Sequence, residues 1–309
     1  MKQATLNDYK RRLLRVLVHV QRHLDDPMHL DLLAGLACFS PFHFHRIFKG
    51  MMGESVMEYV RRLRLERAAT QLKLGSRPVT RIALDAGYES HEAFSRSFKM
   101  LFGLSPSRFR SGKKVRFASQ LAKFHYRNGG TLENFRTVSP GGKMMEVQIN
   151  KLEPKRVAFL RHVGPYNDVG RTWDRLLMLL GKDGWIGGNC EFIGICYDDP
   201  EVTPQRKIRY DACVTVDNSF EPFDDIAVLV IAGGEYARMT HVGPYDRLNA
   251  TYARLLGQWI PRSGRELRSI PCFEVYLTDP NSTDPDENLT DVYAPLEPVR
   301  GELLEGASL

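Results

Sequence analysis

The sequence has few cysteines and no long hydrophobic run. No apolar stretch approaches the roughly 18 residues of a membrane-spanning helix, so we expect no membrane partner. Residues 1–25 mix Arg, Lys, Asp and His, which excludes a secretory signal peptide and predicts a cytoplasmic protein. The cysteines are scattered and lack metal-ligand spacing to nearby His, so we expect buried, reduced thiols and neither a metal nor another cofactor. They are Cys38, Cys190, Cys196, Cys213 and Cys272.

The charge of the chain is unevenly divided. With 309 residues, 43% of them hydrophobic and 26% charged, the chain has the composition of an ordinary globular protein of about two domains. Residues 1–120 hold 22 Lys+Arg against 10 Asp+Glu, whereas the remainder holds 21 against 27. A basic part joined to an acidic part predicts that only the first part meets a polyanion.

Two internal repeats, confined to separate parts of the chain, predict two domains that are each built by duplication. The second repeat has an offset of 79 residues and copies the HVGPY motif of His162–Tyr166 at His241–Tyr245. Between the repeats, clusters of Gly, Pro and Ser predict a linker, part of which, around Ala118–Tyr126, we expect to be helical. The first repeat has an offset of 50 residues: Ser40, Phe44, Arg46, Phe48, Lys49, Gly53 and Ser55 recur as Ser90, Phe94, Arg96, Phe98, Lys99, Gly103 and Ser105.

Amphipathic periodicity and end signals predict a wholly helical N-terminal part. We expect Ser40 to cap one helix and Ser55 with Glu58 to form a capping box that opens a long one. That long helix, of about 18 residues, would span roughly 27 Å, near the roughly 34 Å between successive major grooves of DNA. The predicted helices are Tyr9–His23, Leu30–Ala37, Phe42–Met52, Ser55–Lys73, one from Val79, one from His91 to Phe102 after a turn at Gly87-Tyr88, and a short one opened by Ser105-Pro106.

Two of these helices, those after Ser40 and Ser90, have an apolar and a polar face. Each polar face presents an Arg and a Lys one turn apart, beside groups that form hydrogen bonds. Cations for phosphates and polar groups for base edges are what a helix in the major groove needs. The outward residues are Phe42, His45, Arg46 and Lys49 in the first helix, and Glu92, Ser95, Arg96 and Lys99 in the second.

The segments Ile82–Ser90, Phe94–Lys99, Gly103–Pro106 and Phe109–Arg110 together resemble the signature of AraC/XylS-type regulators. The resemblance covers about residues 8–112 and implies a monomeric DNA reader with two helix-turn-helix units. By position it implies that these outward residues, together with His91, face DNA. Phe42 stands where relatives carry Trp, and Glu92 would repel phosphate, so the target sequence stays open.

The C-terminal part changes to short β-branched runs that alternate with helical stretches, which predicts two strands, a helix and two strands in each copy. The strand predicted at Phe273–Leu277 leaves two alternatives. Alternation places Glu274 and Tyr276 on one face, which is either exposed and without a special role or part of a groove between the copies. In a groove, a carboxylate among aromatic rings would suit a lipophilic cation. The Gly-Pro turns after His162 and His241 favour ordinary strand-end histidines over catalytic ones.

Residues 144–299 also resemble the GyrI-like effector domain, a duplicated βαββ module. The HVGPY copies, the Phe273–Tyr276 strand and Leu289–Leu296 carry the resemblance. It implies a groove between the copies and a buried, ligand-facing Glu that matches Glu274, and so favours the pocket. The candidate effector contacts are Glu274, Tyr276, Trp173, Tyr252, Tyr166 and Tyr245.

The sequence therefore predicts a multi-domain protein: an all-α DNA-binding domain with two helix-turn-helix units at 1–112, a linker at 113–143 and an α+β GyrI-like domain at 144–309. We expect a transcription regulator that acts as an activator. Its expected partners are double-stranded DNA, which it would bind as a monomer, a small effector and RNA polymerase. Two alternatives give the C-terminal domain another role. It could be a hydrolase with Glu274 as general base, for which no nucleophile–base set is visible, or a protein-docking module with a filled groove. We predict that the protein is not an enzyme.

Overall fold

The computed structural model describes residues 2–112, 137–138, 146–200 and 202–299. The predicted linker, including its expected helix at Ala118–Tyr126, lies almost wholly outside the described residues. The chain forms two compact units, of which the first comprises Met1–Asn7, Phe39–Met51 and Ser139–Leu309 and the second Asp8–Cys38 and Met52–Val138. The first unit thus joins one helix of the N-terminal repeat to the C-terminal part, so the predicted domain boundaries remain a prediction.

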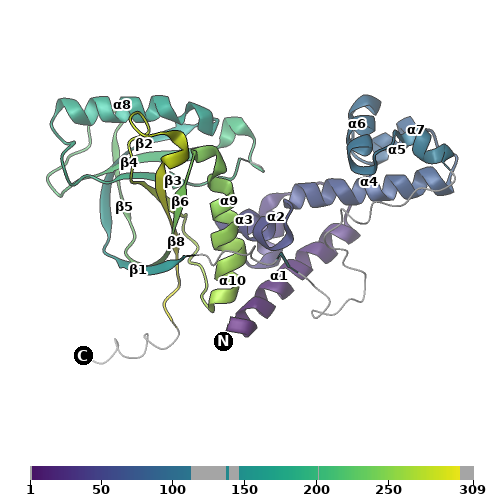
Figure 1. The fold of residues 1–309 in the computed structure, drawn as a ribbon, viewed down its shortest axis with the longest axis horizontal. Helices are drawn as coiled ribbons and strands as arrows, with labels where there is room; N and C mark the ends of the chain where they lie inside the picture. The colour runs from purple at the N-terminus through teal and green to yellow at the C-terminus, as the bar shows by residue number, and fades with distance from the viewer. Residues whose placement is uncertain (1, 113–136, 139–145, 201, 300–309) are drawn as a thin grey trace. The chain divides into compact units, whose positions relative to one another are not determined.

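The N-terminal helices follow the predicted pattern (Figure 1). The predicted capping box is present, because the Ser55 hydroxyl accepts from Glu58 N at 3.1 Å and the Glu58 carboxylate accepts from Ser55 N at 2.7 Å. Gly87 makes the turn between α5 and α6 at φ +81°, where a Cβ would also lie 2.7 Å from the Arg64 guanidinium. The helices are α1 (Lys2–Arg22), α2 (Leu30–Ala37), α3 (Pro41–Met52), α4 (Val56–Leu74), α5 (Val79–Asp85), α6 (His91–Phe102) and α7 (Pro106–Ser111).

The second helix-turn-helix has its own aromatic core. Phe94 and Phe98 of α6 are fully buried, and the ring of Phe98 lies edge-on to that of Phe109 in α7, with centroids 5.2 Å apart. Leu65 and Leu72 of α4 and Ile82 of α5 complete the cluster. Because Phe94 and Phe98 are buried in this cluster, the opposite face of α6 points outward.

The C-terminal part is one antiparallel sheet with helices, and each copy has the predicted order of two strands, a helix and two strands. The first copy contains β1 (Gln148–Leu152), β2 (Lys155–Val163), α8 (Val169–Lys182), β3 (Phe192–Cys196) and β4 (Arg209–Thr215). The second contains β5 (Ala227–Ile231), β6 (Gly234–Val242), α9 (Leu248–Arg254), the π-helical turn η5 (Leu255–Trp259), α10 (Ile260–Ser263), β7 (Phe273–Tyr276) and β8 (Leu289–Pro295).

The two copies are interlaced in the eight-stranded sheet, whose order is β1-β6-β8-β7-β3-β4-β2-β5. The first strand of each copy pairs with the second strand of the other copy, as β1 with β6 and β5 with β2. The copies also meet at the centre, where β3 pairs with β7 and Gly194 lies opposite Glu274. Neither copy can therefore complete its part of the sheet alone.

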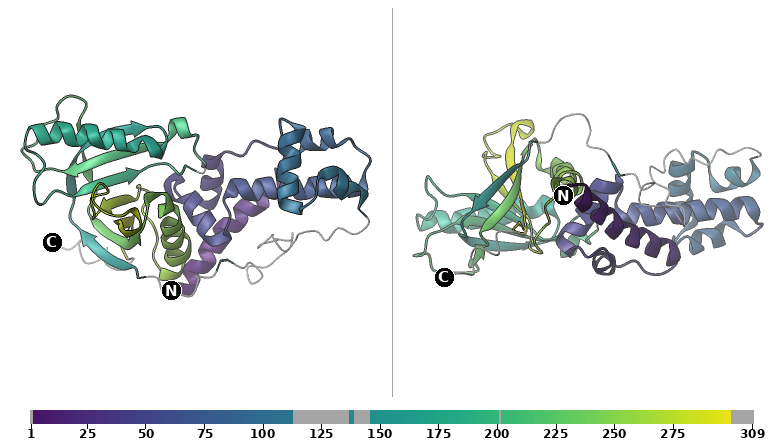
Figure 2. Two further views of the ribbon diagram at one scale, coloured as in Figure 1. Left: turned by 45° about the horizontal axis from the view of Figure 1, so that its top comes forward. Right: turned by 90° about the horizontal axis from the view of Figure 1, so that it is seen from below.

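Both faces of this sheet carry apolar side chains. On the helix side, Leu176 and Leu180 of α8 pack against strand residues such as Leu160, and Figures 1 and 2 show α8 across this face. On the other side, Phe273 and Val275 join a second core, in which the rings of Phe273 and Tyr293 stack with centroids 4.8 Å apart. The apolar residues of β7 thus pack away from Glu274. Among the described residues, no helix combines the length and apolar character needed to cross a bilayer.

Candidate functional site

A cavity of about 990 Å³ opens on the helix side of the sheet, within the first unit. Aromatic side chains from both copies line it, with Trp173 of α8 and Tyr252 of α9 on the helices and Tyr210 and Tyr276 on the strands. Its size and aromatic lining are those of a site for a small organic ligand. Of the charged side chains in its lining, Asp174, Asp246 and Asp279 are exposed, whereas Glu274 and Arg46 are buried.

The Glu274 carboxylate is 4% exposed and is the acceptor of three hydrogen bonds. Tyr252 donates to Oε1 at 2.9 Å, Tyr276 donates to Oε2 at 2.7 Å, and the Cys196 thiol lies 3.3 Å from Oε1. Within the described residues no Lys, Arg or His nitrogen lies within ion-pair distance of this carboxylate. Glu274 therefore offers a pre-oriented negative charge without a cation of its own.

A second layer of hydrogen bonds fixes the tyrosines. Trp173 Nε1 donates to the Tyr210 hydroxyl at 2.9 Å, and this hydroxyl lies 2.9 Å from that of Tyr276. Burial raises the pKa values of Tyr210, Tyr252 and Tyr276 well above their ordinary value, and the nearby Glu274 charge raises them further. The three phenols stay neutral and remain hydrogen-bond donors around the carboxylate.

The duplication is asymmetric at the centre of the site. At an offset of 80 residues, Asp211 of β4 corresponds to Asp291 of β8, and Gly194 of β3 corresponds to Glu274. A Cβ on Gly194 would lie 2.4 Å from the Tyr276 hydroxyl and 2.5 Å from the Tyr210 hydroxyl. One copy thus supplies the carboxylate, and the other supplies the space in which two tyrosines close over it.

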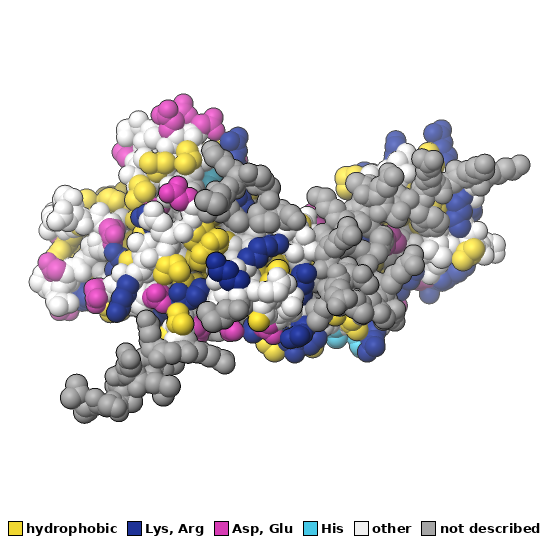
Figure 3. Space-filling model, turned by 60° about the horizontal axis from the view of Figure 1, so that its bottom comes forward, with side chains coloured by type: hydrophobic (Ala, Val, Ile, Leu, Met, Phe, Trp, Pro, Cys, Tyr) yellow, Lys and Arg dark blue, Asp and Glu magenta, His cyan; other side chains and the backbone are white. Residues whose placement is uncertain are grey.

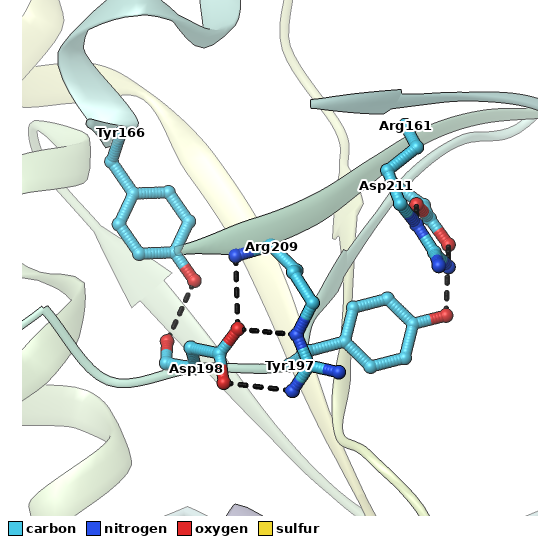
Figure 4. A network of polar contacts seen from close by, with 6 residues as sticks. All are labelled: Arg161, Tyr166, Tyr197, Asp198, Arg209 and Asp211. Carbon is cyan, nitrogen blue, oxygen red and sulfur yellow. Dashed lines mark hydrogen bonds and ion pairs between the residues drawn. The ribbon is translucent and has the colours of Figure 1, made fainter. Parts of the chain in front are cut away.

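Ion pairs hold the segment that follows β3 at the rim of the cavity (Figure 4). The Asp198 carboxylate accepts from Arg209 N, Nε and Nη2 at 2.8 to 2.9 Å, and the Asp198 carbonyl accepts from the Tyr166 hydroxyl at 2.8 Å. On the other side of the strand, Asp211 binds Arg161 through both carboxylate oxygens and accepts from Tyr197 at 2.8 Å. These contacts fix the backbone on either side of Tyr197 and Asp198.

The two HVGPY histidines have structural contacts, in line with their interpretation as strand-end residues. His162 Nδ1 lies 3.1 Å from the Thr172 hydroxyl and its Nε2 lies 3.0 Å from the Pro165 carbonyl. His241 repeats both contacts with Thr251 and Pro244, at 2.8 and 3.1 Å. Each histidine ties a strand end to the helix that follows it. In the described part of the chain, no three His, Cys, Asp or Glu side chains are grouped as a metal site would need.

The comparisons with known proteins agree with this two-part organisation. Residues 33–112 match the model of a helix-turn-helix domain, and residues 145–297 match that of the GyrI-like small molecule binding domain. The chain is 33% identical over 100 residues to the regulatory protein SoxS of Salmonella typhimurium, a match that covers 32% of this chain and 94% of SoxS. The chain belongs to the AraC family of transcription regulators.

In two further comparisons, the match covers a smaller share of the relative or the sequence identity is lower. The right origin-binding protein of Escherichia coli is 37% identical over 95 residues, which are 31% of this regulator and 33% of the relative. The matched region thus spans about a third of that relative's length. The C-terminal domain of EcmrR has 19% sequence identity and a TM-score of 0.42, and the match covers 51% of this chain and all of that domain.

All six predicted effector contacts of the regulator line the cavity: Glu274, Tyr276, Trp173, Tyr252, Tyr166 and Tyr245. The alternation in β7 therefore leads to a pocket and not to an exposed, featureless face. Two contacts of this site, Tyr210 and Cys196, were not predicted from the sequence. Both lie on the same sheet face as Glu274, because β3 lies beside β7 and β4 lies beside β3. Strand alternation predicts the face on which each residue lies, but the strand order that brings them to Glu274 is a long-range pairing.

The polar face of α6 is accessible, as DNA recognition requires. His91, Glu92, Arg96 and Lys99 are exposed, and Ser95 is half-buried with its hydroxyl 3.5 Å from His91 Nε2. Figure 3 shows Lys and Arg side chains on the N-terminal part seen from below, whereas carboxylates lie mostly over the C-terminal part.

The polar face of α3 departs from the prediction that it is exposed. His45 and Arg46 are 1% and 6% exposed, while Phe42 and Lys49 are half-buried. The cause is a tertiary contact that helical periodicity does not report: α3 packs against the C-terminal part, and Arg46 lines the cavity. In this structure the α3 side chains that the family resemblance assigns to DNA therefore have intramolecular partners. Another correction concerns Ser40, whose buried hydroxyl has no hydrogen-bond partner among the described residues and so does not cap α3.

Proposed function

We propose that this regulator binds a lipophilic organic cation in the cavity of its C-terminal part. The observation that carries the proposal is the buried Glu274 carboxylate, which faces an aromatic cavity and has no ion-pair partner among the described residues. A buried charge is costly unless it is paired, so a ligand that brings a positive charge gains both the electrostatic attraction and the cation–π contacts of Trp173 and Tyr252. The three exposed aspartates at the rim add to the preference for cations.

Charge recognition can be separated from shape recognition with two probes. Tetraphenylphosphonium and tetraphenylborate have nearly the same shape and opposite charges. Calorimetric titration of the full chain should show binding of the phosphonium and none of the borate. Equal binding of the two would mean that the cavity selects apolar shape and that Glu274 has no electrostatic role.

The variant Glu274→Gln keeps the shape of the side chain and removes its charge. It should weaken phosphonium binding by about 2–5 kcal/mol, the cost of losing one partner of a buried charge pair. Glu221→Gln removes an exposed carboxylate that does not line the cavity, so it should bind like the wild type. Unchanged binding by Glu274→Gln would exclude the proposed site.

The protein's role on DNA forms the second part of the proposal. The helix-turn-helix units would read double-stranded DNA as a monomer, with His91, Glu92, Ser95, Arg96 and Lys99 of α6 facing the groove. The α3 residues Phe42, His45, Arg46 and Lys49 would join them when their polar face is free. Activation through RNA polymerase fits this arrangement. Titration of labelled duplexes from the gene's own upstream region, with and without tetraphenylphosphonium, tests sequence-selective and salt-sensitive binding.

The chemistry of the cavity favours binding over hydrolysis. Among the described lining residues there is no serine or histidine to form a nucleophile–base pair. Burial raises the pKa of the Cys196 thiol well above its ordinary value, and the adjacent Glu274 charge raises it further. A thiol that stays protonated is a poor nucleophile. We therefore include in the proposal that the protein acts as a sensor and not as an enzyme.

A further inference from the structure

The polar face of α3 lies against the same helix that supplies Tyr252 to the cavity. The role inferred below for this contact rests on the proposed effector site and concerns its regulation. Figures 1 and 2 show α3 beside α9, and contacts at three levels hold the two together. We refer to Phe42, His43, His45, Arg46 and Gly50 as the docked face of α3.

The first contact is a close crossing of two backbones at a pair of glycines. A Cβ on Gly50 would lie 2.1 Å from the Ala253 carbonyl oxygen and 2.7 Å from Gly257 Cα. A Cβ on Gly257, in the π-helical turn η5, would lie 2.4 Å from Gly50 Cα. Because the obstructing atoms are backbone atoms, neither glycine can carry a side chain while α3 is docked.

The second contact is a set of buried polar interactions. His45 Nδ1 lies 2.8 Å from an Asp199 carboxylate oxygen, and His43 Nε2 donates to the Arg268 carbonyl at 3.0 Å. The neighbour of Asp199, Asp198, is held by Arg209, which fixes the segment that His45 meets (Figure 4). The docked face thus has specific partners on two separate segments of the C-terminal part.

The third contact is that of Arg46 with the cavity itself. The guanidinium carbon lies 3.8 Å from the centroid of the Tyr252 ring, and the Tyr252 hydroxyl donates to Glu274. Within the described residues Arg46 has no ion pair, and its buried Nε has no hydrogen-bond partner. Arg46 therefore places a buried cation on the ring of Tyr252, whose hydroxyl binds the Glu274 carboxylate. A buried cation on an aromatic ring is also the chemistry proposed for the effector.

We propose that Arg46 acts as an internal cation that competes with the effector, so that effector binding releases the docked face of α3 for DNA. Two positive charges in one poorly solvated cavity repel each other, and both need the face of Tyr252. The docked form excludes DNA from α3, and the effector-bound form excludes docking. Thermodynamic linkage then requires that DNA raise the affinity for the effector by the same factor by which the effector raises the affinity for DNA.

Gly257→Ala tests the docking without altering a residue of the cavity lining or of the predicted DNA faces. The added methyl group cannot fit against Gly50, whereas an alanine in a helical segment is otherwise favourable. The matched control is Gly181→Ala in α8, whose Cβ would meet only the Ile186 methyl at an ordinary 3.8 Å. The full-length proteins are titrated with a duplex selected from random sequence by the wild type, with and without tetraphenylphosphonium.

We expect Gly257→Ala without phosphonium to bind the duplex as tightly as the wild type does with it. The gain should be on the order of 5- to 150-fold, the usual range of coupling between two sites. The control should behave like the wild type. If calorimetry shows Glu274-dependent phosphonium binding but neither phosphonium nor Gly257→Ala changes DNA affinity, the release mechanism is wrong and the effector site stands. If phosphonium does not bind at all, the effector proposal fails, and an effect of Gly257→Ala would still establish the docking.

A second variant tests the competition directly and covers the case in which Gly257→Ala does not fold. Arg46→Met keeps a long side chain and removes the charge. Without DNA, it should bind tetraphenylphosphonium more tightly than the wild type, because the competing cation is gone. Equal or weaker binding would show that Arg46 does not compete with the effector and would overturn the proposal.

Discussion

Helices α3 and α6 share a sequence pattern but differ in what covers them. Each places an Arg and a Lys one turn apart on its polar face, at an offset of 50 residues. In α6 that face is open, with Arg96 exposed, whereas in α3 it is closed, with Arg46 only 6% exposed and stacked on Tyr252. A repeated pattern therefore predicts which face of a helix is polar, and tertiary contacts decide whether that face is available.

The two copies differ at the position that matters for this contact. Gly50 of α3 corresponds to Met100 of α6, which is 82% exposed. A methionine at position 50 could not fit against the Ala253 carbonyl and the Gly257 backbone. The glycine that departs from the repeat thus lies in the helix that is covered by the C-terminal part. Substitutions that compare the two helices can test this difference.

The largest difference between the helices should appear in the pH dependence of stability. Burial, helped by the nearby Arg46 charge, lowers the pKa of His43 to about 4, against the opposing effect of hydrogen bonds to the Arg268 and Ile270 carbonyls. Of the ionisable groups, Arg46 and Cys272 lie near the ring, whereas Arg268 contributes its backbone carbonyl. Because the folded state resists protonation, the stability present above pH 6.5 is lost as the pH falls toward 4, by up to about 3 kcal/mol.

His43→Ala places at this position the residue that α6 carries, Ala93. The free energy of unfolding, measured in urea from pH 7 to pH 4, should fall less steeply for the variant than for the wild type. Parallel curves would show that His43 is not held neutral in the docked helix. The control is His91→Ala, which removes an exposed histidine of α6 and should leave the curve unchanged.

The arginines should differ in their effect on DNA binding. Arg96→Ala should weaken specific binding by about 1–3 kcal/mol, the value of a side chain that reads a base, whether or not the effector is present. Arg46→Ala should cause no loss until tetraphenylphosphonium is added, because the docked α3 does not contact DNA. Fluorescence anisotropy with a labelled duplex measures both. An equal loss for the two variants without effector would place both helices on DNA at all times.

The smallest expected difference concerns the two serines before the helices. The Ser90 hydroxyl accepts from Ala93 N at 3.1 Å and caps α6, whereas the Ser40 hydroxyl has no partner among the described residues. Ser90→Ala should therefore lower the free energy of unfolding by about 1 kcal/mol, and Ser40→Ala should not lower it. Chemical unfolding of the two variants side by side gives the comparison. A loss of similar size for Ser40→Ala would mean that its hydroxyl does stabilise the helix.

Much of the fold could be predicted from local signals. The bounds of α6 and the capping box of α4 match the prediction, since caps and apolar periodicity act within a few residues. The order of strands and helices in each copy could be predicted for the same reason. The interlacing of β1 with β6 could not, because it pairs residues 82 to 90 positions apart and no local pattern encodes that partner.

The candidate site was predictable where it repeats a motif or obeys strand alternation. Tyr166, Tyr245 and Glu274 all line the cavity as expected. Arg46 was assigned to DNA because its helical position and charge fit that role. Its burial depends on Tyr252 and Gly257, more than 200 residues away, and on the absence of side chains at a glycine crossing. Sequence periodicity carries no information about such a distant partner.

The wide separation of Gly50 and Gly257 has a consequence for the newly made protein. The crossing joins residues 207 positions apart, so α3 is synthesised well before the segment that covers it. At roughly 5–20 residues per second, the interval is about 10–40 s. During that interval the polar face of α3 on the growing chain lacks the segment that covers it, and it can dock only once α9 and η5 have been made.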